Sequence, residues 1–140
     1  MQKEFHKDDI QKIAQAVLGF LATGETATVV TLSGDLGAGK TTLTQAIARE
    51  LGITENIISP TFVIMKRYEL HKKNLIHIDA YRLESADELL KLGWAELIAD
   101  PKNLILIEWP EKVAEIIPKN AVRVSLAHHA REATRTIIVE

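Results

Sequence analysis

A glycine-rich segment, GDLGAGKT at residues 34–41, constrains the fold of this chain more than any other feature. It fits the pattern G-x-x-x-x-G-K-[ST] and lies between an apolar β-branched run, TVVTLS, and a stretch with helical periodicity. A phosphate-binding loop requires this context, because backbone N–H groups and the positive end of the helix dipole surround a phosphate. The segment therefore predicts a nucleotide site at the end of a strand.

Each residue type in this loop has a predicted role. Glycines free the backbone to curl around a β-phosphate, Lys40 reaches the β- and γ-phosphates, and the Thr41 hydroxyl binds Mg²⁺. A turn that only linked a strand to a helix would not explain the Lys-Thr pair. The nucleotide-binding residues predicted from the loop are Gly34, Asp35, Leu36, Gly37, Ala38, Gly39, Lys40, Thr41 and Thr42.

Apolar β-branched runs alternate with amphipathic stretches along the chain, which is typical of an α/β domain with a mainly parallel sheet. We predict a single P-loop NTPase-type domain over residues 1–140, with flanking helices and antiparallel edge strands. Strands are expected at residues 2–6, 28–33, 61–70, 75–79, 104–108, 122–126 and 136–139, the last two as edges. Helices are expected from residue 10 to near residue 24, at 41–51 and at 84–92, and from Pro110, with Ser85 and Glu88 as a capping box.

Charge and cysteine content exclude several classes of protein. Seventeen Lys and Arg against nineteen Asp and Glu give a net charge of −2, which argues against a chain that grips nucleic acid through bulk charge. The lack of cysteine excludes a disulfide framework, a thiolate nucleophile and cysteine-ligated metals. No apolar run approaches the roughly 18 residues that a membrane span needs, so we expect a soluble cytoplasmic protein without a membrane partner.

Two carboxylates end apolar runs, Asp79 after NLIHI and Glu108 after NLILI. In a parallel sheet both would lie at the carboxyl edge, where ligands of open α/β sheets bind. We assign Asp79 to Mg²⁺, and Glu108 to orienting the attacking water or joining the metal shell, the alternative being a buried or helix-capping carboxylate. Trp109 is either core or a wall of the site. His77 shares the strand face of Asp79 and is expected either to pack in the core or to support a residue of the site from behind, rather than act as a base.

Four segments in order resemble the TsaE-type P-loop ATPases that serve bacterial tRNA threonylcarbamoyladenosine synthesis. They are LSGDLGAGKTT (residues 32–42), SPTF (59–62), HIDAYRL (77–83) and IEWPE (107–111). The resemblance implies an ATPase that uses ATP and Mg²⁺, with turnover that is weak alone and controlled by partners. It implies a complex with TsaD-type and TsaB-type proteins, one of which transfers threonylcarbamoyl to an adenosine beside the tRNA anticodon. The chain would then contact tRNA only indirectly, through these partners.

The resemblance also implies roles for single residues. Asp79 matches the Walker B acid, Glu108 and Trp109 match an EW pair near the γ-phosphate, and Thr61 belongs to a switch-like loop that contacts the metal or γ-phosphate. The chain departs from the family at Ile10, where members often carry threonine. The resulting assignments are Lys40, Asp79 and Glu108 as catalytic residues, Thr41, Asp79 and Glu108 as metal ligands, and Thr61 and Trp109 as further nucleotide contacts.

Other functions share the phosphate loop. A small-molecule or nucleotide kinase usually needs an arginine-bearing lid, and no arginine-rich stretch lies between residues 92 and 104. A nucleotide-dependent binding switch with little turnover stays open, whereas a GTPase is not expected because no N-K-x-D motif occurs. The basic segment 66–73 is either a solvated turn or a docking surface for a partner or tRNA. His128 and His129 would point to opposite strand faces, which argues against a metal site.

Overall fold

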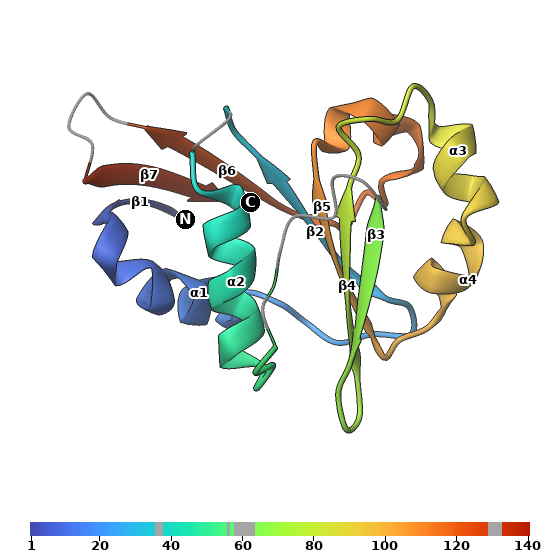
Figure 1. The fold of residues 1–140 in the computed structure, drawn as a ribbon, viewed down its shortest axis with the longest axis horizontal. Coiled ribbons are helices and arrows are strands. Elements are labelled where there is room, and N and C mark those ends of the chain that lie inside the picture. Colours follow the sequence, from blue (N-terminus) through green and yellow to red (C-terminus); the bar gives the residue numbers. More distant parts are fainter. Residues whose placement is uncertain (36–37, 56, 58–63, 129–132) are drawn as a thin grey trace.

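The computed structural model describes residues 1–35, 38–55, 57, 64–128 and 133–140 (Figure 1). The predictions for Leu36, Gly37, the SPTF segment with Thr61, and His129 concern residues outside these ranges, as does the beginning of the strand expected at 61–70.

One mixed sheet forms the centre of the described chain, with the strand order β1-β7-β6-β2-β5-β4-β3. Its inner strands β6, β2, β5 and β4 are parallel, while β1, β7 and β3 pair antiparallel with their neighbours. The predicted fold class is therefore confirmed. The strands are β1 (Gln2–His6), β2 (Thr28–Ser33), β3 (Met65–Glu69), β4 (Asn74–Asp79), β5 (Asn103–Glu108), β6 (Val122–His128) and β7 (Thr134–Val139).

Helices cover both faces of the sheet (Figure 1). α1 (Ile10–Gly19) and α2 (Lys40–Glu50) lie on one face, and α3 (Ala86–Lys91), α4 (Trp94–Ala99) and the 3₁₀ helix η2 (Pro110–Ile116) lie on the other. A short 3₁₀ turn, η1 (Lys7–Asp9), precedes α1. No helix in the described ranges combines the length and apolarity needed to cross a membrane.

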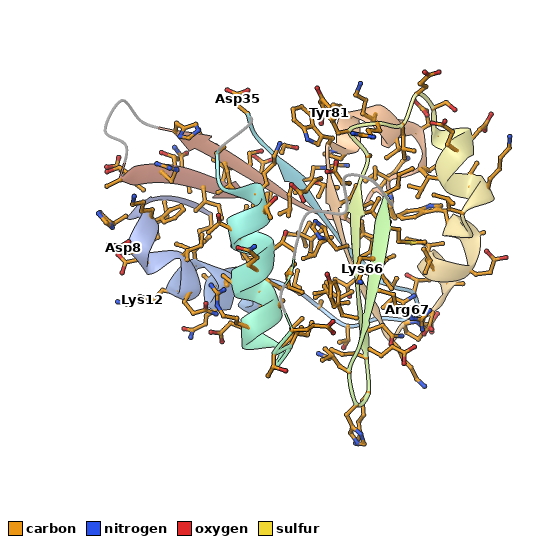
Figure 2. The ribbon with its side chains drawn as sticks, in the orientation of Figure 1. Asp8, Lys12, Asp35, Lys66, Arg67 and Tyr81 are labelled. Atoms are coloured by element: carbon orange, nitrogen blue, oxygen red, sulfur yellow. The ribbon has the colours of Figure 1, made fainter. Side chains whose placement is uncertain are left out.

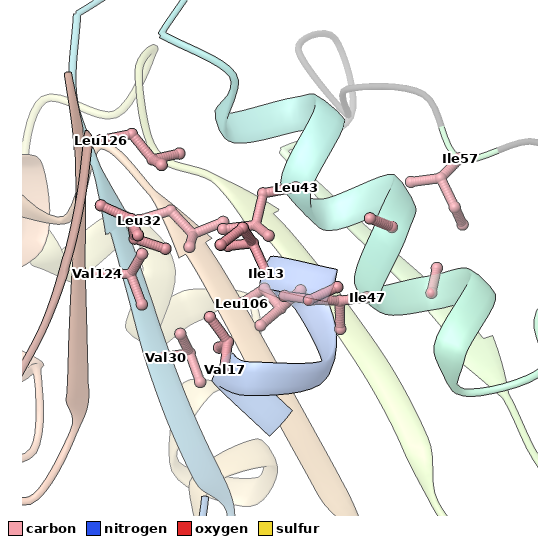
Figure 3. Close-up of a cluster of buried hydrophobic side chains, with 14 of the residues drawn as sticks. Ile13, Val17, Val30, Leu32, Leu43, Ile47, Ile57, Leu106, Val124 and Leu126 are labelled. Carbon is pink, nitrogen blue, oxygen red and sulfur yellow. The ribbon is translucent and has the colours of Figure 1, made fainter. Parts of the chain in front are cut away.

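The inner strand β5 explains why two cores form. All six of its residues are buried, and Leu104 and Leu106 join the core under α1 and α2 while Ile105 and Ile107 join the opposite core. This agrees with the near-continuous apolar runs typical of parallel strands covered on both faces. Figure 3 shows the first core, where side chains of α1 and α2 meet those of β2, β5 and β6.

The first helix is shorter than predicted. α1 ends at Gly19 instead of near Gly24, because the N–H groups of Phe20 and Leu21 donate to the carbonyls of Val17 and Leu18 and close the helix with a tight turn. Leu21 still packs partly against the core, which is why its apolar spacing continues the helical pattern. Helix α2 agrees with its prediction to within one residue and is followed by Gly52 at φ 90°.

The prediction of edge strands at residues 122–126 and 136–139 is wrong. β6 pairs with both β2 and β7, and β7 pairs with both β6 and β1, so β1 and β3 form the edges of the described sheet. Polar residues alternate with buried ones along β6. That alternation indicates a sheet face open to water, and it does not reveal whether the backbone has a second partner.

The helical segment after β4 also differs from its prediction. Gly93, at φ 96°, separates α3 from α4, and the sequence analysis did not anticipate α4. The capping box is incomplete, because the Ser85 side chain makes no cap hydrogen bond and the Glu88 carboxylate instead accepts the N–H of Glu84 at 2.7 Å. Pro110 begins a 3₁₀ helix, η2, at the position where its missing N–H is tolerated.

Candidate nucleotide site

Two glycines give the loop after β2 its shape. Gly34 has a φ of 144°, and a Cβ placed on it would lie 2.4 Å from the carbonyl oxygen of Leu126 in β6. Gly39 has a φ of 104° and caps the amino end of α2, where its carbonyl accepts the N–H of Leu43. Only glycine fits the first position, and the second has a conformation that favours glycine. The described part of the loop therefore has a tight entry at Gly34 and a helix start at Gly39, which the predicted phosphate-binding loop requires.

Lys40 is the most unusual side chain of this loop, because it is 95% buried. Its Nζ donates to the Gly34 carbonyl at 2.6 Å and lies 3.7 Å from the centroid of the Trp109 ring. Among the described residues it forms no ion pair with a carboxylate. A buried ammonium without a counter-ion is costly, so the site is prepared to accept an anion.

Trp109 is held over the loop by its backbone. Its φ of 58° and ψ of 51° are left-handed and uncommon for a residue other than glycine, and they come directly after the end of β5. The ring contacts Lys40 on one side and lies 5.0 Å from the Tyr81 ring, centroid to centroid. It also packs against the second core. Trp109 thus combines both of the placements that the sequence left open.

Asp79 and Glu108 lie side by side at the carboxyl edge of the sheet. They are register partners on the parallel strands β4 and β5, and both are buried. Asp79 Oδ1 accepts the N–H of Tyr81 at 3.0 Å, and Glu108 Oε1 accepts the Thr41 hydroxyl at 3.4 Å. The two predicted acids and the predicted Mg²⁺ ligand of the loop therefore share one site.

His77 makes a contact that the sequence analysis missed. Its Nε2 lies 2.6 Å from Glu108 Oε2, and the imidazole is fully buried. The sequence indicated a packed or supporting histidine on the face of Asp79, without identifying its partner. Its partner depends on the alignment of β4 with β5, which places His77 opposite Leu106 and thus diagonally across from Glu108.

The oxygen donors of this site suit Mg²⁺ bound together with phosphates. No group of three or more His, Cys, Asp or Glu that could hold a metal alone occurs among the described residues. Mg²⁺ is usually held by one or two carboxylates and by substrate phosphates, with water completing the octahedron. Thr41, Asp79 and Glu108 fit that donor set, because they supply one hydroxyl and two carboxylates.

A cavity of about 220 Å³ lies next to the loop, and the sequence analysis did not anticipate it. Gly39 and Thr42 form its loop side, Ile10 of α1 lines it, and Leu126 and Arg135 come from the β6–β7 pair. These residues are far apart in the chain, so no local pattern could have indicated the cavity. Ile10 is the position where the chain departs from the TsaE pattern, and it now has a location beside the predicted nucleotide residues.

The basic segment 66–73 runs from β3 into the turn before β4. Asp35 and Tyr81 are found toward the same end of the molecule, whereas Lys66 and Arg67 lie along β3 (Figure 2). The turn between β3 and β4, closed by the N–H of Leu70 and the carbonyl of Lys73, is at the amino end of β4, opposite to the end that carries Asp79. The turn residues 70–73 therefore lie away from the candidate site, whereas Lys66, at the start of the basic segment, is the register partner of His77.

Comparison with known proteins agrees with the resemblance seen in the sequence. The family described as "Threonylcarbamoyl adenosine biosynthesis protein TsaE" matches residues 5–137. The tRNA threonylcarbamoyladenosine biosynthesis protein TsaE of Bacillus subtilis (strain 168) is 37% identical over 134 residues, 94% of this chain and 81% of that protein. The protein of the same name from Rickettsia prowazekii (strain Madrid E) is 41% identical over 99 residues, 70% of this chain and 67% of that protein.

A solved structure supports the same relationship. The crystal structure of Bacillus subtilis YdiB matches with a TM-score of 0.75 and 29% identity, and the match covers 98% of this chain and 83% of that one. The family match extends over nearly the whole chain, and both of the relatives named above exceed 30% identity. The chain therefore belongs to the TsaE family of threonylcarbamoyl adenosine biosynthesis proteins.

Proposed function

We propose that this chain binds ATP with Mg²⁺ and hydrolyses it, as a subunit required for the threonylcarbamoyl modification of an adenosine beside the tRNA anticodon. The observation that carries the proposal is the buried ammonium of Lys40, whose described partners are a carbonyl and an aromatic ring. A triphosphate would supply the missing negative charge. Family membership supplies the process in which the hydrolysis is used.

In this proposal the residues of the loop bind the phosphates. Lys40 leaves the Gly34 carbonyl and donates to the β- and γ-phosphates, while the amino end of α2 adds backbone N–H groups and its dipole. Thr41, Asp79 and Glu108 would hold Mg²⁺, with Thr61 as a further candidate outside the described residues. When bound, Mg²⁺ would offset the negative charge of the phosphates.

Glu108 is the proposed group that orients the attacking water. The water oxygen bonds to the γ-phosphorus, the bond from that phosphorus to the bridging oxygen breaks, and ADP and inorganic phosphate leave. Both protons of the water leave with the released phosphate. A buried carboxylate at the end of β5 is suited to this role, because its orientation is fixed before the substrate arrives.

We propose that the cavity beside the loop takes the adenine base. Its position next to Gly39 and Thr42 puts it within reach of a nucleotide whose phosphates lie in the loop. Phe5, Ile10 and Leu126 offer apolar walls for a planar base, and Arg135 adds a polar group.

The proposed partners are TsaD-type and TsaB-type proteins, which would carry the tRNA and perform the transfer. The net charge of −2 suits a subunit that meets tRNA through partners rather than by bulk electrostatics. A cytoplasmic location follows from that role.

The test measures phosphate release from ATP by the isolated chain, then with both partner proteins, with and without tRNA. We expect Lys40→Ala to lose ATP binding, whereas Glu108→Ala should bind ATP and lose hydrolysis. Equal loss of ATP affinity in both variants would remove Glu108 from the catalytic role. Phosphate transfer to a small acceptor in place of water, with no response to partners, would favour a kinase. ATP binding without turnover under any condition would favour a binding switch.

A further inference from the structure

His77 directs its polar contact at Glu108. The imidazole is fully buried on β4, and its Nε2 lies 2.6 Å from Glu108 Oε2. Its Nδ1 has no hydrogen-bond partner among the described residues. A carboxylate accepts hydrogen bonds, so the geometry assigns the ring proton to Nε2. Among the described residues, His77 thus makes one side-chain hydrogen bond, which it donates to the proposed catalytic carboxylate.

The two oxygens of Glu108 have different partners. Oε2 accepts from His77, and Oε1 accepts from the Thr41 hydroxyl at the start of α2. The contact with His77 is short, at 2.6 Å, and that with Thr41 is long, at 3.4 Å, so His77 is the stronger restraint on the carboxylate while Oε1 faces Thr41. This orientation leaves Oε1 as the oxygen nearest the place where metal, water and γ-phosphate would meet.

Packing alone does not account for a histidine at this position. Leu75 precedes it by two residues on the same strand, and Leu106 is its register partner on β5, and both side chains belong to the apolar core. An apolar residue would continue that core without leaving a buried nitrogen unpaired. The feature that distinguishes position 77 from these neighbours is the presence of Glu108 within hydrogen-bond distance.

We propose that His77 is a positioning residue for hydrolysis, which donates Nε2–H to Glu108 Oε2 and thereby holds Oε1 toward Thr41 and the attacking water. The inference rests on the ATP hydrolysis proposed above and adds a residue to it. His77 touches neither substrate nor metal in this role. It acts through the orientation of Glu108, as residues behind metal ligands and catalytic carboxylates commonly do.

The kinetic test compares two substitutions. His77→Phe keeps a planar ring and removes the donor, while His77→Gln places a side-chain N–H at a similar reach. We expect His77→Phe to lower kcat roughly 10- to 100-fold with ATP affinity changed less than about threefold, and His77→Gln to recover most of kcat. Ile76→Val is the control, because Ile76 is the neighbouring β4 residue that packs in the opposite core. Rates are compared per folded molecule, from denaturation curves.

The kcat values of the His77 variants can also contradict the positioning role. Wild-type kcat in His77→Phe, or equal losses in His77→Phe and His77→Gln, would reduce His77 to a packing residue. In the double variant His77→Phe/Glu108→Gln, we expect the loss in kcat to match that of Glu108→Gln alone. Additive losses would show that the two residues act independently.

A readout that does not use activity keeps this test separate from the proposed function. In ¹⁵N-histidine-labelled protein, we expect a slowly exchanging Nε2–H proton from His77 at low field, which moves upfield in Glu108→Gln. If the Nε2–H signal is absent, or if its chemical shift is unchanged in Glu108→Gln, the positioning role is wrong. The wild-type signal can be observed even if a His77 variant fails to fold. If the signal is present but the wild type hydrolyses no ATP with or without partners, the proposed hydrolysis fails, and the positioning role fails with it.

Discussion

The ammonium of Lys40 lies 3.7 Å from the centroid of the Trp109 ring, inside the protein and at the mouth of the phosphate loop. The two residues come from opposite sides of the site, since Lys40 begins α2 and Trp109 follows β5. The ring and the Gly34 carbonyl partly replace water around the charge, and neither replaces a counter-ion. The free protein therefore holds a charge that nucleotide would neutralise.

We expect Lys40→Met to keep at least the free energy of unfolding of the wild type while losing the binding of Mg-ATP. Removing a buried charge that has no carboxylate partner in the described chain should leave the free energy of unfolding unchanged or raise it by about 1 kcal/mol. The same variant should lose the increase in Tm that Mg-ATP gives the wild type. Denaturation with and without Mg-ATP measures both effects. A large loss of stability without nucleotide would contradict the interpretation of Lys40 as an unpaired charge.

Gly34 provides a prediction about the loop. A Cβ at this position would lie 2.4 Å from the Leu126 carbonyl oxygen, and φ is 144°, so Gly34→Ala should lower the free energy of unfolding by about 2 kcal/mol or more. Gly19 is the matched control, because it ends α1 and a Cβ there would meet no atom within 4 Å. Gly19→Ala should raise stability by about 0.5–1 kcal/mol. Urea denaturation of both variants distinguishes the two environments, and similar effects would contradict the close approach at Gly34.

The raised pKa of Tyr68 predicts that the free energy of unfolding changes with pH in the alkaline range. Burial raises the pKa of Tyr68 above its ordinary value, and the negative charge of Glu55 raises it further. The folded protein then retains the proton more tightly than the unfolded chain, so the free energy of unfolding falls as pH rises above about 10. Tyr68→Phe should reduce that fall.

The same variant tests the packing of the Tyr68 hydroxyl. That hydroxyl has no hydrogen-bond partner among the described residues, so Tyr68→Phe should cost less than about 1 kcal/mol at pH 7. Denaturation at pH 7 and at pH 10.5 measures both effects. An unchanged alkaline slope would show that Tyr68 is not its source.

The cavity beside the loop predicts an effect on nucleotide binding. Ile10→Trp should fill part of the cavity and raise the Kd for ATP at least about tenfold, while binding of inorganic tripolyphosphate stays the same. Lys12→Trp is the control, because Lys12 is exposed on the same helix and does not line the cavity. Calorimetry with both ligands measures the difference. Equal weakening of ATP and tripolyphosphate would argue against a base in this cavity.

Much of the site could be predicted because its residues lie at the ends of strands. The loop follows β2, and Asp79 and Glu108 terminate β4 and β5, so the strand pattern alone brings them to one edge. The contact between His77 and Glu108 could not be predicted in the same way. It depends on the alignment of two parallel strands, and an alignment shifted by one residue would turn one of the two side chains to the other face.

In the fold, too, features that depend on local sequence could be predicted, whereas the pairing of distant strands could not. Buried strands such as β2 and β5 stand out because apolar and β-branched residues fill most of their positions on both faces. The positions of β6 and β7 in the sheet depend on which strands pair with them. In the pairing of β1 with β7, the two strands are more than a hundred residues apart in the chain. Helix α4 was not predicted, because its six residues after Gly93 are too few to give a clear helical periodicity.

The strand order has a consequence for how the protein is made. β2 carries the phosphate loop, yet both of its neighbours, β5 and β6, come from the second half of the chain. During synthesis the loop emerges early but lacks its supports until residues near Leu126, whose carbonyl lies against Gly34, have been added. Such non-local parallel pairing is slow to form. Nucleotide affinity should therefore arise late in folding, and a chain that binds nucleotide is one whose sheet is already complete.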